Sequence, residues 1–410
     1  MQVLFITWDG PGSTYLEGLF LPIFQALRPR GFQFHVLQFT WCGEEERTRL
    51  AQASAAAGIS YRSASVWRRP VAPGSLATAL LGRRHVRRAI RSIGIDILMP
   101  RSTLPALAAI PAAGEGGARL PLLLDADGLP HDERVEFNGA SPTGPSYRLL
   151  RDIEAWAVRS ADAVVVRTAR AAGILAHRAG TGVGVERFHV VANARNENIF
   201  RPPSSKERGA RRSALGLNED QPLLVYTGSS LVGKYRGEAI FRFLREVRAI
   251  RSDARLLLLM PLHEEAHELM ASNPDIAAAC IVRSADPHEV AGWLGAADLG
   301  IALIHATFSM QAVAAIKLGE YLLCGLPVLA SAGVGDTDTI IGSSVGRCLV
   351  EPDEQSLASA AHWFVNTVLP DRVGFEQRCR ANGLANFSLD SAVRDYGDAL
   401  RAALEARLGG

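Results

Sequence analysis

The chain has 410 residues and a formal net charge of +2, with 48% hydrophobic and 21% charged residues, which excludes an intrinsically disordered protein. No stretch of about 18 uncharged apolar residues occurs, which excludes a transmembrane helix. The apolar run at residues 1–8 has no basic segment before it, which indicates a first β-strand and not a signal peptide. Five scattered cysteines favour free thiols in a cytoplasmic protein over a zinc site or a disulfide framework.

Short apolar runs alternate with amphipathic stretches over the first 200 residues. We expect strands at residues 3–7, 32–37, 95–99, 121–124, 163–166 and 189–191. Helices are expected between them, at about 14–28, 45–57, 74–91, 103–112, 146–159 and 168–178.

A polar break at residues 201–218 precedes a second alternating region. Its expected strands are 223–226, 255–259, 279–282, 299–303 and 327–329. Its expected helices are about 237–251, 263–272, 287–296, 311–324 and 353–368, followed by a last amphipathic helix at 391–408. The alternation predicts an α/β protein with two doubly wound, Rossmann-like domains of about 200 residues each.

Lysine is rare in this chain, since only Lys206, Lys234 and Lys317 accompany 41 arginines. Lysine is a compact charge that suits phosphate, and Lys234 lies in a glycine-bearing loop between a strand and a helix. Tyr235 follows it, so the loop is not a Walker A motif.

A second glycine-bearing loop, with Gly10 and Gly12, follows the first strand of the chain. The next helix offers free N–H groups to an anion. Tyr15 breaks the GxGxxG pattern and no acidic residue ends the second strand, which disfavours a nicotinamide cofactor. A plain turn without ligand remains the alternative.

Lys317 and Glu320 are spaced i, i+3 on a helix that is otherwise mostly apolar. Charged side chains on a buried helix must face a cleft or a partner. The alternative is an ion pair between the two residues themselves.

The segment GEYLLCGLPV at residues 319–328 resembles the corresponding segment of retaining GT-B glycosyltransferases of family 4. Further similar segments are VYTGS at 225–229 with Lys234 and Tyr235, DPHEV at 286–290, AADLG at 296–300, VANARN at 191–196 with Phe200, and FS at 387–388 with Tyr396. The resemblance implies a GT-B fold whose domains face each other across a cleft. It implies an N-terminal acceptor-side domain at 1–200, a nucleotide-sugar donor domain at 201–388, and a C-terminal helix at 389–410 that crosses back to the first domain.

The resemblance also implies roles for individual residues in binding a nucleotide-diphosphate sugar. Glu320 would hold the ribose hydroxyls, Lys234 and Lys317 would face the diphosphate, and the region of Ser284 would meet the base. The donor-binding set implied is Gly10, Gly12, Gly228, Ser229, Lys234, Tyr235, Ser284, Lys317 and Glu320. Two positions depart from the family pattern: Ala312 stands where a further Glu is usual, and Ser229 stands where an Arg is usual.

The segment after the expected strand at 121–124 contains four candidate site residues, namely Asp125, Asp127, His131 and Glu133. Asp125 and Asp127 form a DxD pattern, which is the metal site of GT-A glycosyltransferases. We interpret the segment instead as an acceptor-side loop of a GT-B enzyme, whose residues contact the acceptor hydroxyl or the donor sugar. Together with Lys234 and Lys317 they are the expected catalytic residues, with no metal and no cofactor. A surface loop with solvated charges is the alternative for each.

Arginines and apolar residues interleave from Arg68 to Arg91. This pattern is typical of a basic amphipathic helix that contacts an anionic membrane surface or a phosphorylated acceptor. The balanced charge of the whole chain disfavours nucleic acid, and a solvated arginine face is the alternative.

The sequence therefore predicts a cytoplasmic, metal-independent, retaining glycosyltransferase, and peripheral contact with the inner face of the membrane is an option that the stretch from Arg68 to Arg91 leaves open. Its partners would be a nucleotide-sugar donor and a small-molecule, glycan or lipid-linked acceptor. Two alternatives stay open: a nucleotide-sugar epimerase or hydrolase on the same fold, and a non-catalytic subunit that binds sugar nucleotides.

Overall fold

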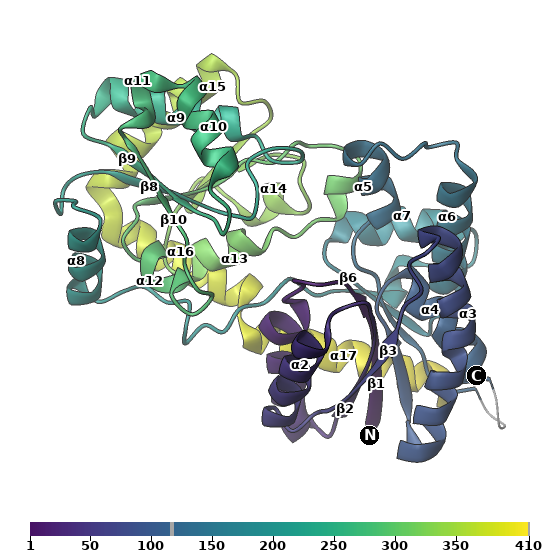
Figure 1. Cartoon of the computed structure of the whole chain (residues 1–410). Helices are drawn as coiled ribbons and strands as arrows, with labels where there is room; N and C mark the ends of the chain where they lie inside the picture. Colours follow the sequence, from purple (N-terminus) through teal and green to yellow (C-terminus); the bar gives the residue numbers. More distant parts are fainter. Residues whose placement is uncertain (115–118, 409–410) are drawn as a thin grey trace. The chain divides into compact units, whose positions relative to one another are not determined.

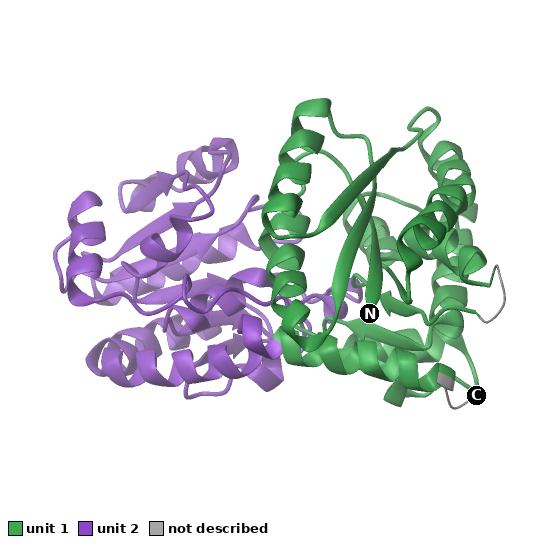
Figure 2. Cartoon of the chain, turned by 90° about the horizontal axis from the view of Figure 1, so that it is seen from below, with its two compact units in different colours: residues 1–192, 392–410 green, residues 193–391 purple. Residues whose placement is uncertain are grey.

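A computed structural model describes residues 1–114 and 119–408, which form two compact units (Figures 1 and 2). Unit 1 comprises residues 1–192 and 392–410, and unit 2 comprises residues 193–391. The last helix, α17 (Leu389–Leu408), thus packs for most of its length with the N-terminal unit.

Unit 1 contains two parallel sheets with the strand orders β3-β2-β1-β4 and β5-β6-β7. Single parallel bridges, Leu98 to Leu122 and Arg101 to Asp125, connect β4 to β5 at the sheet edges. The strands are β1 (Gln2–Asp9), β2 (Gln33–Thr40), β3 (Ser60–Ser65), β4 (Ile97–Pro100), β5 (Leu123–Asp125), β6 (Ala163–Val166) and β7 (Phe188–Val190). Most are continuous apolar runs because helices cover both faces of a parallel sheet.

The helices of unit 1 lie between these strands in the chain. They are α1 (Leu21–Leu27), α2 (Glu44–Ala56), α3 (Val71–Ala89), α4 (Thr103–Ala113), α5 (Pro130–Phe137), α6 (Pro145–Ser160) and α7 (Ala169–Ala179). Two elements were not predicted. β3 is an edge strand with mostly exposed polar residues, so it lacks an apolar run, and α5 begins at a proline within the segment that we interpreted as a loop.

Unit 2 contains one parallel sheet of six strands in the order β10-β9-β8-β11-β12-β13. The strands are β8 (Leu223–Thr227), β9 (Arg255–Leu259), β10 (Cys280–Arg283), β11 (Leu299–Ala302), β12 (Val328–Ser331) and β13 (Gly346–Leu349). The helices are α8 (Ser205–Ala214), α9 (Gly237–Ile250), α10 (Glu264–Ser272), α11 (Pro274–Ala277), α12 (Val290–Leu294), α13 (Ile316–Leu323), α14 (Thr337–Ile340), α15 (Glu354–Trp363) and α16 (Arg372–Phe387).

In unit 2, the elements α11, α14, α16 and β13 were not predicted, and two expectations were wrong. The polar break at 201–218 contains α8, which begins with a capping box between Ser204 and Glu207 and so needs no apolar stripe to start. The helix expected at 311–324 begins only at Ile316, because Ser309–Ala312 form a 3-10 turn and residues 313–315 are non-helical.

Both units reverse their strand order beside their first strand, between β1 and β4 and between β8 and β11. Doubly wound sheets bind ligands at such points, outside the carboxyl ends of the strands. The topology therefore predicts that ligands bind at the loops that follow these four strands.

Candidate functional site

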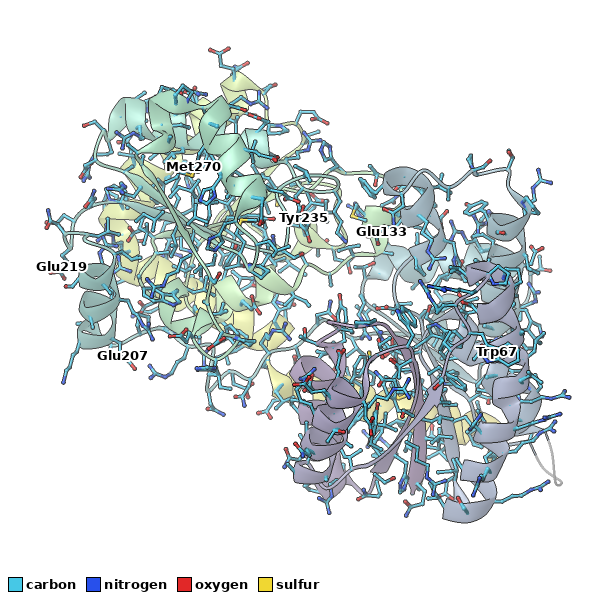
Figure 3. All side chains as sticks on the ribbon, viewed as in Figure 1. Trp67, Glu133, Glu207, Glu219, Tyr235 and Met270 are labelled. Carbon is cyan, nitrogen blue, oxygen red and sulfur yellow. The ribbon has the colours of Figure 1, made fainter. Side chains whose placement is uncertain are left out.

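In unit 2, the loop after β8 is hydrogen-bonded to the residues that follow the neighbouring strand β11. Tyr235 pairs with Ile304, the His305 N–H donates to the Lys234 carbonyl at 2.9 Å, and the Arg236 N–H donates to the Leu303 carbonyl at 3.2 Å. These contacts hold Lys234 and Tyr235 at the point of strand reversal (Tyr235 is labelled in Figure 3).

Gly228 and Ser229 begin the same loop. A Cβ at position 228 would lie 2.7 Å from the Tyr226 hydroxyl oxygen, so the close approach of the loop to this ring requires glycine. The Ser229 side chain is exposed, and it brings no positive charge to the loop.

Lys317 lies in the first turn of α13 and is 8% exposed. Its Nζ is 3.9 Å from the ring centre of Tyr226 and 4.6 Å from that of Tyr235. No hydrogen-bond acceptor in the described part of the chain reaches this Nζ. Burial lowers the pKa of Lys317 to about 7, although Glu320 opposes the shift. A buried cation without an acceptor is destabilising unless a ligand supplies negative charge.

Helix α13 is positioned over the centre of the sheet by Tyr321. Its phenol oxygen accepts a hydrogen bond from the Thr227 N–H at 2.9 Å, at the last residue of β8. Gly300 of β11 leaves room for the same ring, since a Cβ there would lie 2.4 Å from it. Lys317 and Glu320 are therefore carried at the carboxyl ends of β8 and β11.

Glu320 is paired with Arg195 and not with Lys317. Arg195 Nε donates to Glu320 Oε1 at 2.8 Å, and the two side chains are 15% and 12% exposed. The alternative of an ion pair between Lys317 and Glu320 was therefore wrong. The sequence carried no signal for this partner, because 125 residues separate Arg195 from Glu320.

Ser284 follows β10 at the same edge of the sheet. Its hydroxyl oxygen lies 2.9 Å from His263 Nε2 and donates to the Met260 carbonyl at 3.3 Å. Ser284 and the loop that contains Lys234 both follow parallel strands, and so they share the edge where a ligand of unit 2 would bind.

In unit 1, charged residues occupy the ends of β1, β4 and β5. Arg101 is 5% exposed, and its guanidinium lies 2.7 Å from Asp127 and 3.6 Å from Asp9. Asp9 also accepts hydrogen bonds from Thr7 at 2.7 Å and Gln38 at 3.0 Å. Arg101 was not among the expected site residues, although it follows the expected strand at 95–99 after a single proline.

Asp125 differs from the other candidates because it is fully buried. Its two oxygens accept hydrogen bonds from Arg167 at 2.7 and 2.8 Å, and Oδ2 also accepts one from Tyr396 at 2.6 Å. These bonds give Asp125 a structural role, since Asp125 and Arg167 anchor α17, yellow in Figure 1, to the rest of unit 1. The expected catalytic role of Asp125 stays a prediction.

The other three candidates of this segment, Asp127, His131 and Glu133, differ from Asp125 in exposure or in hydrogen-bond partners. The Asp127 side chain is 38% exposed, and Glu133, labelled in Figure 3, is partly exposed in the first turn of α5. His131 is buried, with Nε2 2.8 Å from Thr103 Oγ1, and burial lowers its pKa to about 4, so that it is neutral at pH 7. Within residues 1–114 and 119–408, no three His, Cys, Asp or Glu side chains are grouped to hold a metal ion.

Local structure accounts for the presence of glycine at both positions 10 and 12 in the loop after β1. A Cβ at Gly10 would lie 2.3 Å from the Trp41 ring, and Gly12 has φ of +77°. The Gly12 N–H donates to Glu46 Oε1 at 3.0 Å. These contacts explain both residues without a ligand, and the space around Gly12 is open.

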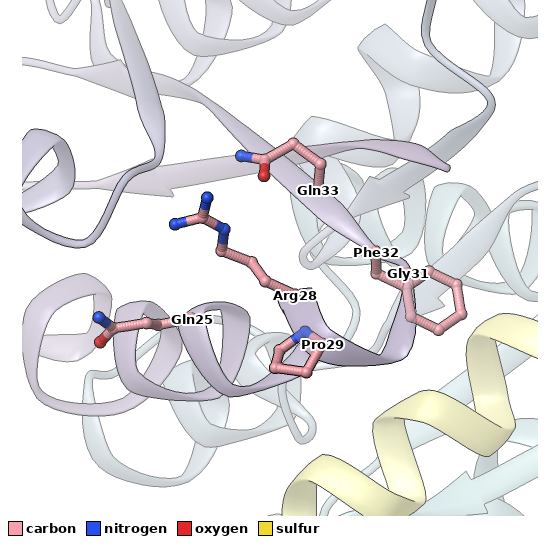
Figure 4. Close-up of a pocket in the computed structure, with 6 residues that line it drawn as sticks. All are labelled: Gln25, Arg28, Pro29, Gly31, Phe32 and Gln33. Carbon is pink, nitrogen blue, oxygen red and sulfur yellow. The ribbon is translucent and has the colours of Figure 1, made fainter.

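A cavity of about 570 Å³ lies elsewhere in unit 1 (Figure 4). Its lining residues are Gln25, Arg28, Pro29, Gly31, Phe32 and Gln33, which include none of the candidates above. We therefore do not associate it with the site.

Two α/β units built on parallel sheets, each with a reversal of strand order beside its first strand, match the GT-B fold, and the solved structures that resemble the chain share it. Anabaena HepE in complex with UDP is 16% identical, with a TM-score of 0.71, and the match covers 98% of this chain and 100% of that one. A glycosyltransferase from Rickettsia africae is 14% identical, with a TM-score of 0.73 and coverage of 99% and 98%. WaaG, a glycosyltransferase involved in lipopolysaccharide biosynthesis, is 17% identical, with a TM-score of 0.69 and coverage of 97% and 98%.

The N-terminal half carries a more specific similarity. Residues 23–198 match the family described as Glycosyltransferase Family 4. No curated protein sequence matches the chain. The fold is that of the GT-B glycosyltransferases, and the family similarity lies in unit 1 and the first residues of unit 2.

Proposed function

We propose that this chain is a glycosyltransferase that transfers a sugar from a nucleotide-diphosphate donor to an acceptor hydroxyl, with retention and without a metal. The observation that carries the proposal is Lys317, a buried cation whose Nζ reaches no acceptor in the described chain, at the strand reversal of unit 2. The match of residues 23–198 to Glycosyltransferase Family 4 supports the reaction class.

In this proposal unit 2 binds the donor. Lys234 and Lys317 stabilise the negative charge that develops on the departing diphosphate. Glu320, held by Arg195, accepts hydrogen bonds from the ribose hydroxyls. The base binds beside Ser284, and the complex of Anabaena HepE with UDP supports uracil as that base.

Unit 1 supplies the acceptor side in this proposal. Asp125, Asp127, His131 and Glu133 remain the residues proposed to contact the acceptor or the donor sugar, and Asp125 is the one whose oxygens also bind Arg167 and Tyr396. His131 is neutral at pH 7 and so can position a hydroxyl but does not bring a charge. The acceptor class proposed is a small molecule, a glycan or a lipid-linked sugar.

Titration calorimetry with UDP and GDP tests the donor site. Lys234→Ala removes a charge-assisted contact worth about 1.5–3 kcal/mol, so the Kd should rise roughly 10- to 150-fold. Lys206→Ala, which removes an exposed lysine of α8, is the matched control and should leave the Kd unchanged. Equal affinities of wild type and Lys234→Ala would contradict the assignment.

Product analysis tests the reaction itself. The chain is incubated with UDP-sugars, with and without candidate acceptors, and the anomeric configuration of the product is read by NMR. Transfer with retention supports the proposal. Turnover of donor alone indicates an epimerase or hydrolase, and binding without any turnover indicates a non-catalytic subunit.

A further inference from the structure

Helix α3 lies in the middle of an unusually cationic stretch of unit 1. From Arg47 to Ile95 the chain has ten arginines and no Asp or Glu. Half of these arginines lie on the last turns of α3 and the turn that follows, namely Arg83, Arg84, Arg87, Arg88 and Arg91. A strong excess of one charge on one element is a feature of surfaces that bind a partner of opposite charge.

The exposed face of α3 combines these arginines with apolar side chains. Leu80 is 55% exposed and Leu81 is 43% exposed. Arg84, Arg88 and Arg91 follow Leu80 at spacings that place them on the same face of a helix. The opposite face, with Ala79, Gly82, Val86 and Ala89, is buried. The exposed leucines therefore are not needed for packing within unit 1.

The arginines of this face surround a hollow. Arg84, Arg87, Arg88, Arg91 and Ser92 line a space of about 470 Å³. The hollow is large enough for a phosphate group, and in the described part of the chain no carboxylate forms an ion pair with Arg84, Arg88 or Arg91.

An exposed aromatic residue, Trp67, lies just before the N-terminal end of α3. Trp67, labelled in Figure 3, is 58% exposed. Its backbone lies against α3, since a Cβ at Gly74 would lie 2.6 Å from the Trp67 carbonyl oxygen. Tryptophan is enriched where a protein meets the headgroup region of a bilayer. Within the described residues, no helix is both long and apolar enough to span a membrane.

We propose that the exposed face of α3 binds a membrane surface that contains anionic phospholipids. The arginines contact the lipid phosphates, and Trp67, Leu80 and Leu81 enter the headgroup region, as on other amphipathic helices that lie in the membrane plane. A purely solvated arginine face would leave the exposed leucines and tryptophan unexplained. The proposal is independent of the proposed transferase activity, because vesicle binding is measured without donor or acceptor.

Co-sedimentation with vesicles tests the proposal on the full chain. Wild type should bind vesicles that contain phosphatidylglycerol, should not bind vesicles of phosphatidylcholine alone, and should lose binding as salt is added. Each arginine near an anionic surface contributes about fivefold in affinity, so R84Q/R88Q/R91Q should weaken binding by roughly a hundredfold. The control R148Q/R242Q/R394Q removes the same charge from exposed positions on α6, α9 and α17 and should bind within a few-fold of wild type.

The outcomes separate the sources of the binding. Equal loss in both triple variants would indicate net charge alone and would overturn the proposal. Binding of inorganic phosphate by the wild type, seen by calorimetry and lost in R84Q/R88Q/R91Q, without any vesicle binding would also overturn it in favour of a site for a soluble phosphate compound. L80S/L81S keeps the arginines and should weaken vesicle binding severalfold. Unchanged vesicle binding in L80S/L81S would contradict insertion of the leucines.

Discussion

Lys317 is a buried cation whose nearest neighbours are two tyrosine rings. Cation–π contacts with Tyr226 and Tyr235 offset part of the cost of burial, but they do not replace the hydrogen bonds that an ammonium group makes in water. Two charges act on its pKa: that of Glu320 favours the ammonium form, and that of Lys234 disfavours it. Such a residue lowers the stability of the empty protein and becomes favourable when an anion binds.

Replacement of this lysine should therefore stabilise the protein while weakening ligand binding. The pKa of Lys317 is lowered from 10.5 to about 7 on folding, so the unfolded chain binds more protons between these values and the stability of the wild type rises with pH across this window. Lys317→Met should therefore have a higher free energy of unfolding than the wild type. The difference should be largest below pH 7 and small near pH 10. Urea unfolding at both pH values measures the difference.

Lys206→Met provides the control for this comparison, since Lys206 is exposed on α8. It should leave the free energy of unfolding unchanged at both pH values. A Lys317→Met protein that is less stable than wild type below pH 7 would show that the lysine is satisfied in the folded chain.

A variant of Glu320 can show whether this carboxylate contacts a ligand or only forms a structural ion pair with Arg195. Glu320→Gln keeps the shape and weakens the contact to ribose, so it should fold normally and bind UDP at least tenfold more weakly. The variant should also discriminate less against 2′,3′-dideoxyribose donors. Calorimetry and thermal melting are measured on the same protein.

The structural alternative makes a different prediction for the same variant. If Glu320 serves only Arg195, both Glu320→Gln and Arg195→Gln should lower the melting temperature and leave UDP affinity and turnover unchanged. A destabilised but fully active Glu320→Gln protein would end the ribose assignment.

At the scale of elements, the junction between β4 and α4 combines charge with backbone strain. Ser102 has φ of 70° and ψ of −177°, a region that is essentially restricted to glycine. Its N–H donates to the Asp125 carbonyl at 2.8 Å, and the preceding Arg101 N–H donates to the Ile6 carbonyl at 2.8 Å. These bonds fix the chain direction at the strand reversal of unit 1 and maintain the strained conformation.

Glycine at this position should relieve the strain. Ser102→Gly should raise the free energy of unfolding by about 1 kcal/mol, since relief of the positive φ exceeds the added entropy of the unfolded chain. Ser102→Ala keeps the Cβ and should give no such gain. Chemical unfolding of both variants measures the difference, and a destabilised Ser102→Gly protein would indicate that the hydroxyl has a bonding role.

At the scale of the whole molecule, the two DxD carboxylates are engaged by arginines of unit 1. Arg167 and Tyr396 hold Asp125, and Arg101 holds Asp127. A metal ion at this pair would have to displace both guanidinium groups. In the proposed function, Lys234 and Lys317 of unit 2 neutralise the diphosphate in place of a metal ion.

Transfer activity should therefore withstand removal of divalent cations. After exhaustive treatment with EDTA, the initial rate with a UDP-sugar and an active acceptor should remain within about twofold of the untreated rate. A rate that collapses with EDTA and returns on addition of Mn²⁺ would revive the metal site at Asp125 and Asp127. The untreated enzyme assayed with added Mg²⁺ is the reference.

Local sequence patterns predicted most of the architecture. Continuous apolar runs such as β6 and β9 are strands because parallel sheets are covered on both faces, and the signal lies in neighbouring residues. The signal for Lys234 and Lys317 was also local. Lysine is rare in this chain, and their places in a glycine-bearing loop and on an apolar helix made them candidates for a phosphate site. The polar edge strand β3 and the capped helix α8 were missed because neither depends on an apolar pattern.

Only the tertiary structure decided how the charged residues are paired. Glu320 is held by Arg195 and Asp125 is held by Tyr396, partners that lie 125 and 271 residues away in the chain. A carboxylate after a strand looks the same in sequence whether it faces a ligand or a buried guanidinium. The difference arises from packing, because burial and the nearest donors determine whether its oxygens remain available, and neither quantity is encoded in the neighbouring residues alone.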